Sequence, residues 1–251
     1  MASPTEISRI STAEDALRCD LAACYRLVAH FGWDDLIATH ISVRIPGEDS
    51  FLINPFGMLF DEIHPADLIK VDLDGNLLSP SKWAINKAGF VIHSAIHRAR
   101  HDVVCAMHLH TEDGVAVSMV EDGLLPLQQL AMLLDGDIAF HEYEGVAFEL
   151  EERDRLVADL GEKNIMFLRN HGTLTVGSSV AEAFTLMYLL EKSCTAQVRA
   201  LSMGLPLHPV PDDVVAKVSA LRTTDEMDFA EKLLWPAMLR KLDRLDPSWK
   251  E

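Results

Sequence analysis

The sequence has few of the features that direct a protein to a membrane or to nucleic acid. No apolar stretch approaches the ~18 residues that a transmembrane helix needs. The first six residues, Met-Ala-Ser-Pro-Thr-Glu, resemble no part of a secretory signal peptide. Basic residues are scarce, because 22 Lys and Arg stand against 39 Asp and Glu, which gives a formal net charge of −17. Since such a surface repels polyanions, we expect a soluble, cytoplasmic protein without nucleic-acid or membrane partners.

Cysteine is scarce as well. The chain has four cysteines, and no two of them form a CxxC pair: Cys19, Cys24, Cys105 and Cys194. This scatter gives no sign of a disulfide framework or of a cysteine-ligated zinc site. We therefore expect reduced thiols, most of them buried, as is usual in a reducing compartment.

The overall composition is that of an ordinary globular protein. Of the 251 residues, 49% are hydrophobic and 24% are charged. A change of pattern occurs at Pro206, Pro209 and Pro211, where irregular sequence follows a long helical stretch. The sequence therefore predicts one domain over residues 1–204 and a helical C-terminal extension over residues 205–251.

Hydrophobic periodicity indicates an α/β fold. Helical spacing begins at Ser11 or Thr12, where a capping residue is expected, and ends near Gly32. Further helices are predicted over residues 84–99, 112–120, 151–160, 180–203 and 225–245, and strands over 41–45, 51–54, 68–73, 103–110, 137–143, 164–169 and 173–176. Because short hairpin-like strands precede the alternating strands and helices, the pattern favours a three-layer domain with a mixed central sheet covered by helices.

Three histidines have the spacing of a metal site. His108 and His110 lie two apart on a predicted strand, so their side chains point to the same face, ~6.5–7 Å apart along the chain. His171 follows another buried strand, and the adjacent Gly172 permits an unusual backbone turn. Three protein ligands leave coordination positions open, as in catalytic metal sites. The spacing alone leaves open that the HxH pair only packs in the core.

Five segments together resemble the class II aldolase/adducin head-domain family, and their residues are most similar to its adducin-like branch. They are His40-Ile41-Ser42-Val43-Arg44, Phe51-Leu52-Ile53-Asn54-Pro55-Phe56-Gly57, Ala88-Gly89-Phe90-Val91-Ile92-His93-Ser94-Ala95-Ile96, His108-Leu109-His110-Thr111 and Leu168-Arg169-Asn170-His171-Gly172. The resemblance implies a divalent metal ion on His108, His110 and His171, with zinc as the expected ion and manganese or iron as alternatives. It also implies a homotetramer with active sites at the subunit boundaries.

The sequence departs from the pattern of the sugar-phosphate aldolases at three neighbouring positions. The acidic residue that those enzymes use as acid and base falls on Gly89 here, which has no side chain. The two serines that hold substrate phosphate fall on Lys87 and Ala88. The pattern therefore supports the metal site and argues against cleavage of a phosphorylated sugar.

Three residues are candidates for catalysis. His40 stands where many aldolases have a substrate-contacting asparagine, and a histidine that titrates near neutrality can carry protons. Arg44 alternates to the same strand face as His40 and could bind a carboxylate with two hydrogen bonds. Tyr143 ends a predicted strand where the family closes its site. In contrast, we interpret His93 and His97, one helical turn apart, as packing and surface residues.

These features predict a metal-dependent carbon–carbon lyase, aldolase-like or decarboxylating, that acts on a small, non-phosphorylated 2-oxo or 2-hydroxy acid. A metal ion on three histidines would stabilise the enolate left when the adjacent carbon–carbon bond breaks. Two alternatives remain open. One is a non-haem Fe(II) oxygenase on the same scaffold, and the other is a non-catalytic, adducin-like oligomerising and binding domain.

Overall fold

Seven strands form one mixed sheet in the order β3-β2-β1-β4-β7-β6-β5. The structure is a computed structural model that describes residues 4–145, 152–222 and 229–250. Neighbouring strands are antiparallel except for β5 and β6, which are parallel. The strands are β1 (His40–Arg44), β2 (Ser50–Ile53), β3 (Ile69–Asp72), β4 (Cys105–Leu109), β5 (Ile138–His141), β6 (Ile165–Leu168) and β7 (Gly172–Gly177).

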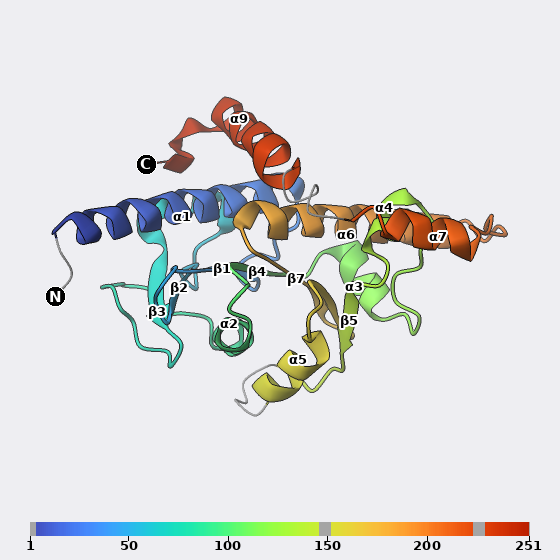
Figure 1. The fold of residues 1–251 in the computed structure, drawn as a ribbon, viewed down its shortest axis with the longest axis horizontal. Helices are drawn as coiled ribbons and strands as arrows, with labels where there is room; N and C mark the ends of the chain where they lie inside the picture. The colour runs from blue at the N-terminus through green and yellow to red at the C-terminus, as the bar shows by residue number, and fades with distance from the viewer. Residues whose placement is uncertain (1–3, 146–151, 223–228, 251) are drawn as a thin grey trace.

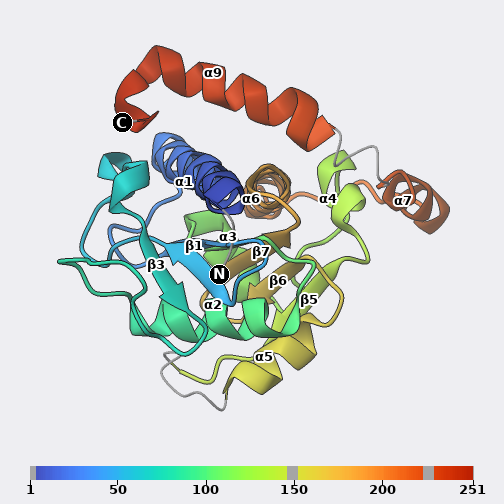
Figure 2. The same ribbon diagram turned by 60° about the vertical axis from the view of Figure 1, so that its left-hand side comes forward.

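Helices cover both faces of this sheet (Figures 1 and 2). One face carries α1, α3 and α6, and the other carries α2 and α5. The helices are α1 (Pro4–Phe31), α2 (Lys87–Ala99), α3 (Glu112–Ser118), α4 (Gln129–Leu134), α5 (Glu152–Leu160), α6 (Val180–Ser202), α7 (Asp212–Ser219) and α9 (Trp235–Leu245). The predicted three-layer α/β architecture with a mixed sheet is therefore confirmed.

Strand β4 is buried on both faces, and its side chains point alternately into two separate cores. Cys105, Met107 and Leu109 belong to the core under α1 and α6, whereas Ala106 belongs to the core under α2 and α5. His108 has the same parity as Ala106, so its side chain lies on the α2 side. The continuous apolar run that predicted a doubly covered strand is explained by this position.

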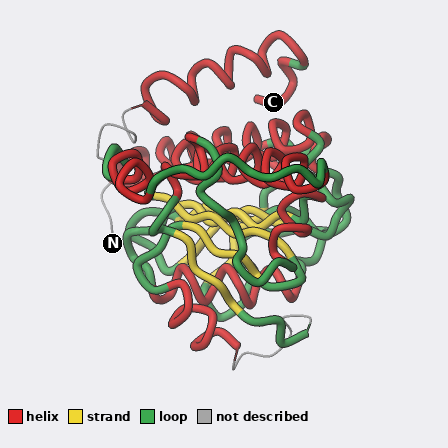
Figure 3. The backbone as a smooth tube through the Cα atoms, turned by 90° about the vertical axis from the view of Figure 1, so that its right-hand side faces the viewer, coloured by secondary structure: helices red, strands yellow, loops and turns green. Residues whose placement is uncertain are grey.

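The C-terminal helix α9 forms an additional layer outside α1 (Figure 3). Trp235 is buried, packs on Phe184 with ring centroids 5.7 Å apart, and donates its indole N–H to Asp20 at 2.9 Å. Leu242 is buried too, whereas Leu233, just before α9, is 63% exposed. The apolar side of α9 therefore closes the core of its own subunit. None of the described helices is both long and apolar enough to cross a bilayer.

Two local expectations need correction. The first helix begins at Pro4, so neither Ser11 nor Thr12 is its N-cap. The short helix α4 over Gln129–Leu134 was not predicted. Its six residues are too few for helical periodicity to show, and the side chain of Gln128 caps it by accepting from Leu130 N at 2.7 Å.

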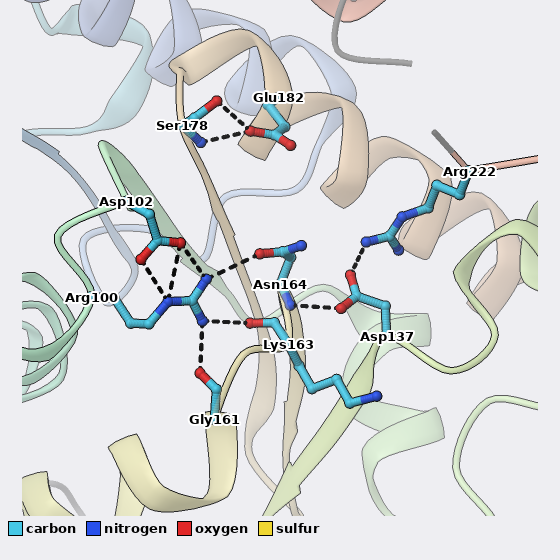
Figure 4. A network of polar contacts seen from close by, with 9 residues as sticks. All are labelled: Arg100, Asp102, Asp137, Gly161, Lys163, Asn164, Ser178, Glu182 and Arg222. Atoms are coloured by element: carbon cyan, nitrogen blue, oxygen red, sulfur yellow. Dashed lines mark hydrogen bonds and ion pairs between the residues drawn. The ribbon is translucent and has the colours of Figure 1, made fainter. Parts of the chain in front are cut away.

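Polar contacts join the elements at the sheet end where β4 begins (Figure 4). The Arg100 guanidinium donates to the carbonyls of Gly161 at 2.7 Å and Lys163 at 3.1 Å, and it also pairs with Asp102. Asp137 accepts the Asn164 N–H at 3.0 Å. This end of the sheet is therefore closed by hydrogen bonds, and the opposite end, where β4 stops, carries the histidines.

One buried hydroxyl connects α1 to the sheet. Tyr25 is fully buried, and its oxygen accepts the N–H groups of Ile41 at 2.9 Å and Asn54 at 3.1 Å. The hydroxyl proton lies within reach of the Ile41 carbonyl and of the Asn54 side-chain oxygen. Because Ile41 follows His40, this oxygen fixes the start of β1.

We expect the substitution Tyr25→Phe to lower the free energy of unfolding by ~2–3 kcal/mol, because it leaves two buried N–H groups without a partner and creates no cavity. Urea denaturation should show a lower midpoint with an unchanged slope. Tyr188→Phe on α6, where the ring is only half-buried, is the matched control. Equal midpoints for the two variants would contradict this reading.

Candidate metal centre

Three imidazoles converge where β4 ends. His108 lies on β4, His110 directly follows that strand, and His171 lies in the turn between β6 and β7. His110 Nε2 is 3.0 Å from His108 Nε2 and 2.9 Å from His171 Nε2. One nitrogen from each ring lies within 4.8 Å of the other two, as a metal site requires. The structure thus brings together the three residues predicted as ligands.

In two of these rings, the nitrogen that faces away from the cluster is already hydrogen-bonded. His108 Nδ1 donates to the Thr173 carbonyl at 2.9 Å, and His110 Nδ1 donates to the Asp35 carboxylate at 3.0 Å. In a neutral imidazole the other nitrogen then carries a lone pair. Two lone pairs therefore face each other across 3.0 Å, which is repulsive unless a cation lies between them.

The donor set and its spacing fit a divalent ion. Nitrogens bound tetrahedrally at 2.0–2.1 Å lie roughly 3.4 Å apart, so movements of a few tenths of an ångström would admit zinc. Hydrogen bonds from the outer nitrogens to a carboxylate and a carbonyl are the usual way in which a protein orients histidine ligands. The three protein ligands would leave at least one position for a substrate oxygen.

Burial keeps two of the three candidate ligands, His108 and His171, in the form that binds metal. His108 is 1% exposed, and this burial holds its pKa well below the usual range. The nearby His171 acts in the same direction with a smaller effect. Burial, with a smaller effect of His110, lowers the pKa of His171 to about 4. Neutral imidazole is the metal-binding form, so binding near neutral pH does not have to displace protons from these two rings.

The turn that presents His171 differs in detail from the sequence expectation. The residue with left-handed backbone is Asn170, with φ 57°, and not Gly172. Gly172 is needed for space instead, because a Cβ there would lie 2.4 Å from the Leu109 carbonyl oxygen and 3.3 Å from His108 Cε1. Asparagine tolerates the left-handed region better than most residues, and glycine lets two ligand-bearing segments approach.

His40 occupies the space in front of Gly89. A Cβ on Gly89 would lie 2.6 Å from His40 Cδ2 and 2.8 Å from His40 Cγ. The His40 ring also lies beside the cluster, with its centroid 5.0 Å from that of His108. The imidazole therefore fills the position where the aldolase pattern would place an acidic side chain.

A chain of buried hydrogen bonds holds His40 in this place. His40 Nδ1 is 2.8 Å from His93 Nε2, and His93 Nδ1 is 2.5 Å from Ser42 Oγ. Ser42 Oγ also lies 2.7 Å from His97 Nε2. The expectation that His93 and His97 are packing and surface residues is wrong in part, since both are fully buried in a polar chain. Burial lowers the pKa of each to about 3.

The other two predicted catalytic residues lie in different places. Tyr143 is 54% exposed beside the cluster, with its ring 6.3 Å from that of His171. Arg44 is four residues from His40 at the other end of β1, about 13 Å away at the usual rise per residue. The alternation expected for Arg44 holds, but the strand carries it away from the histidine cluster.

Sequence reasoning missed several residues that support the cluster. Asp35 lies 75 residues before His110, and no local pattern indicates their contact. Glu191 on α6 carries a weak signal, because it is an acid at a position where the helical periodicity requires a buried residue. Its carboxylate accepts from Thr111, the residue that follows His110.

Gly89→Ala tests the crowding by His40. In an open helix this change stabilises by ~1 kcal/mol, but here the added methyl group collides with an anchored imidazole, so we expect a loss of ~1–3 kcal/mol. In a His40→Ala background the same change should be neutral or stabilising. Thermal or urea unfolding of the four variants measures the difference. Equal effects of Gly89→Ala in both backgrounds would show that His40 does not fill this space.

Asp35→Asn tests the support of His110. We expect Zn²⁺ affinity to fall by roughly 10-fold or more, because the carboxylate orients the ring and raises its basicity. Asp34→Asn, one residue earlier, should bind as the wild type does, and His108→Ala should lose stoichiometric metal. Competition with a chromophoric chelator gives the affinities. If the Asp35 and Asp34 variants bind equally, the carboxylate plays no part at the metal.

Comparisons with known proteins identify the family and the fold. The family model described as Class II Aldolase and Adducin N-terminal domain matches residues 19–198. A Pseudomonas aeruginosa protein provisionally named an aldolase class 2 protein is 47% identical, over 97% of this chain and 95% of its own length. Mouse α-adducin is 44% identical over 75% of this chain, which corresponds to 26% of adducin.

Solved structures agree with these relatives. An aldolase II superfamily protein from Pseudomonas syringae superposes with a TM-score of 0.89 and 45% identity, covering 100% of this chain and 98% of that one. L-fuculose 1-phosphate aldolase from Glaciozyma antarctica gives a TM-score of 0.84 with 28% identity, covering 96% and 94%. The family model spans well over half of the residues, and the full-length relative covers nearly all of them. The chain therefore belongs to the class II aldolase and adducin N-terminal domain family.

Proposed function

We propose that this protein is a metal-dependent carbon–carbon lyase that acts on a small, non-phosphorylated 2-oxo or 2-hydroxy acid. The observation that carries the proposal is the convergence of His108, His110 and His171, two of them with outer nitrogens already hydrogen-bonded. Three imidazole nitrogens suit Zn²⁺ best, and Mn²⁺ or Fe²⁺ are the alternatives. A bound divalent ion would polarise substrate oxygens and stabilise negative charge as the carbon–carbon bond breaks.

His40 is the residue we assign to proton transfer. Its Nδ1 is engaged by His93, which leaves Nε2, 3.0 Å from where a Cβ on Gly89 would lie, as the atom for proton transfer. Donation along the chain can run from His40 towards Ser42, which leaves Nε2 free to accept a proton. It can also run in the opposite direction, which makes Nε2 a donor. One ring could thus serve as base and then as acid.

The surroundings of α2 support a substrate without phosphate. The first N–H groups of a helix commonly hold phosphate, but the N–H groups of Ala88 and Gly89 donate to the Asn86 side chain at 3.0 and 3.4 Å. This cap, together with Lys87 and Ala88 at the positions of the phosphate-binding serines, favours a carboxylate substrate. Tyr143, half exposed beside His171, is placed to contact it.

A second candidate function is a non-catalytic oligomerising and binding domain, which the 44% identity to mouse α-adducin favours. Such a domain needs no proton carrier, so the buried chain behind His40 argues for the enzyme. A third candidate, an Fe(II) oxygenase, needs the same ligands and differs in its use of oxygen. For the enzyme we also expect the family's homotetramer.

Metal analysis and a substrate screen test the proposal together. Protein purified without chelators should carry about one Zn²⁺ per chain, and a panel of 2-oxo and 2-hydroxy acids should yield a carbon–carbon cleavage product without oxygen uptake. His40→Asn should lower kcat by roughly 10²- to 10⁴-fold and retain its metal. His101→Asn, an exposed histidine just after α2, is the control and should behave as the wild type does.

Four outcomes would contradict the proposal. Protein without stoichiometric metal would remove its basis. Oxygen consumption coupled to turnover would favour the oxygenase, and robust cleavage of a sugar phosphate would overturn the assignment of a non-phosphorylated substrate. Metal binding with no turnover on any acid would favour the binding domain.

A further inference from the structure

Helix α6 places a carboxyl group inside the protein without a positive partner. Glu191 is 3% exposed. It accepts the Thr111 hydroxyl at 2.5 Å and, more weakly, the Thr173 hydroxyl at 3.4 Å. The titratable groups coupled to it are Asp113 on α3, whose charge acts on Glu191, and the Cys194 thiol on α6, on which Glu191 acts. Among the described residues, no lysine, arginine or histidine pairs with it.

Both threonines belong to the segments that carry the ligands. Thr111 directly follows His110. Thr173 lies near the start of β7, two residues after His171, and its carbonyl accepts from His108 Nδ1 at 2.9 Å. Glu191 therefore contacts both ligand-bearing segments, one through Thr111 and the other through Thr173.

The chain also keeps room for this carboxyl group. A Cβ on Gly114 would lie 2.9 Å from Glu191 Oε1 and 2.4 Å from Thr111 Oγ1. Gly114 is therefore required for α3 to pack against the pair. The arrangement is closely packed, so that the carboxyl group cannot move away from the two threonines without repacking of α3.

Packing alone does not explain why this residue is an acid. Burial raises the pKa of Glu191 to about 7, and the negative charge of Asp113 acts in the same direction. A neutral glutamine could accept the Thr111 hydroxyl and donate its amide to the Thr173 oxygen, without the cost of burying a charge. A nearby dication would reverse that cost, because three neutral imidazoles bring no negative charge to the site.

We propose that Glu191 is a positioning residue of the metal centre, which fixes the segments of His110 and His171 through Thr111 and Thr173 and supplies a buried negative charge to the divalent ion. This inference rests on the metal centre of the proposed function. It is independent of the reaction and of the substrate. It gives helix α6 a role in supporting the metal centre, although α6 carries none of the three ligands.

Zn²⁺ alone is the probe for the test. Glu191→Gln keeps the shape, one acceptor oxygen for the Thr111 hydroxyl and an amide that can donate to the Thr173 oxygen, and it removes the charge. We therefore expect Zn²⁺ affinity to fall about 10-fold or more, as for other residues behind metal ligands. The melting temperature of the metal-free protein should not fall. Glu182→Gln, which changes a glutamate near the start of the same helix that accepts from Ser178, should leave the affinity unchanged.

A second pair of variants covers the case in which Glu191→Gln does not fold. Thr111→Ser keeps the hydroxyl that Glu191 accepts and should bind Zn²⁺ as the wild type does, whereas Thr111→Val should bind about 10-fold more weakly. Zn²⁺ affinity within 2-fold of the wild type in Glu191→Gln, or equal affinities of the two Thr111 variants, overturns the inference. Wild-type protein that binds no Zn²⁺ would instead overturn the metal centre itself.

Discussion

Strand β4 pairs with β1 on one side and with β7 on the other, and the register of these two ladders determines the site. Across β1 it sets His108 opposite His40, and across β7 it sets His108 opposite Leu174. A slip of β4 by one residue would move His108 to the other face of the sheet, under α1 and α6, and away from His40. The candidate metal ligands, His40 and the turn with His171 all depend on this pairing.

The same pairing creates an unusual electrostatic environment. The α2-facing side of β1 carries His40 and Ser42, which extend into a chain of neutral, buried rings. Burial keeps these histidines uncharged, and the negative groups lie at the edge, in Asp35, or behind the ligands, in Glu191. A dication is the species that would satisfy both the converging lone pairs and the buried acid.

The candidate site differs from the aldolase pattern of its family at two positions, Gly89 and His40. The chain has the fold of class II aldolases and brings three histidines together, but the resemblance places the acid of the aldolase pattern on Gly89. The structure shows a compensating change, because the imidazole of His40 takes the space that a side chain at position 89 would need. A histidine held by His93 can carry protons as a carboxylate does, so loss of the acid does not imply loss of catalysis.

The sequence by itself determined the strands and the mixed three-layer fold, because hydrophobic alternation is a local property of the chain. The candidate ligands followed from the HxH spacing together with the family resemblance. It could not reveal that Asp35 supports His110, that His40 fills the space at Gly89, or that Arg44 lies far from the cluster. It also misjudged His93 and His97, whose partner is Ser42 on another element. Such contacts join residues that are far apart in the chain, so only strand register and helix packing decide them.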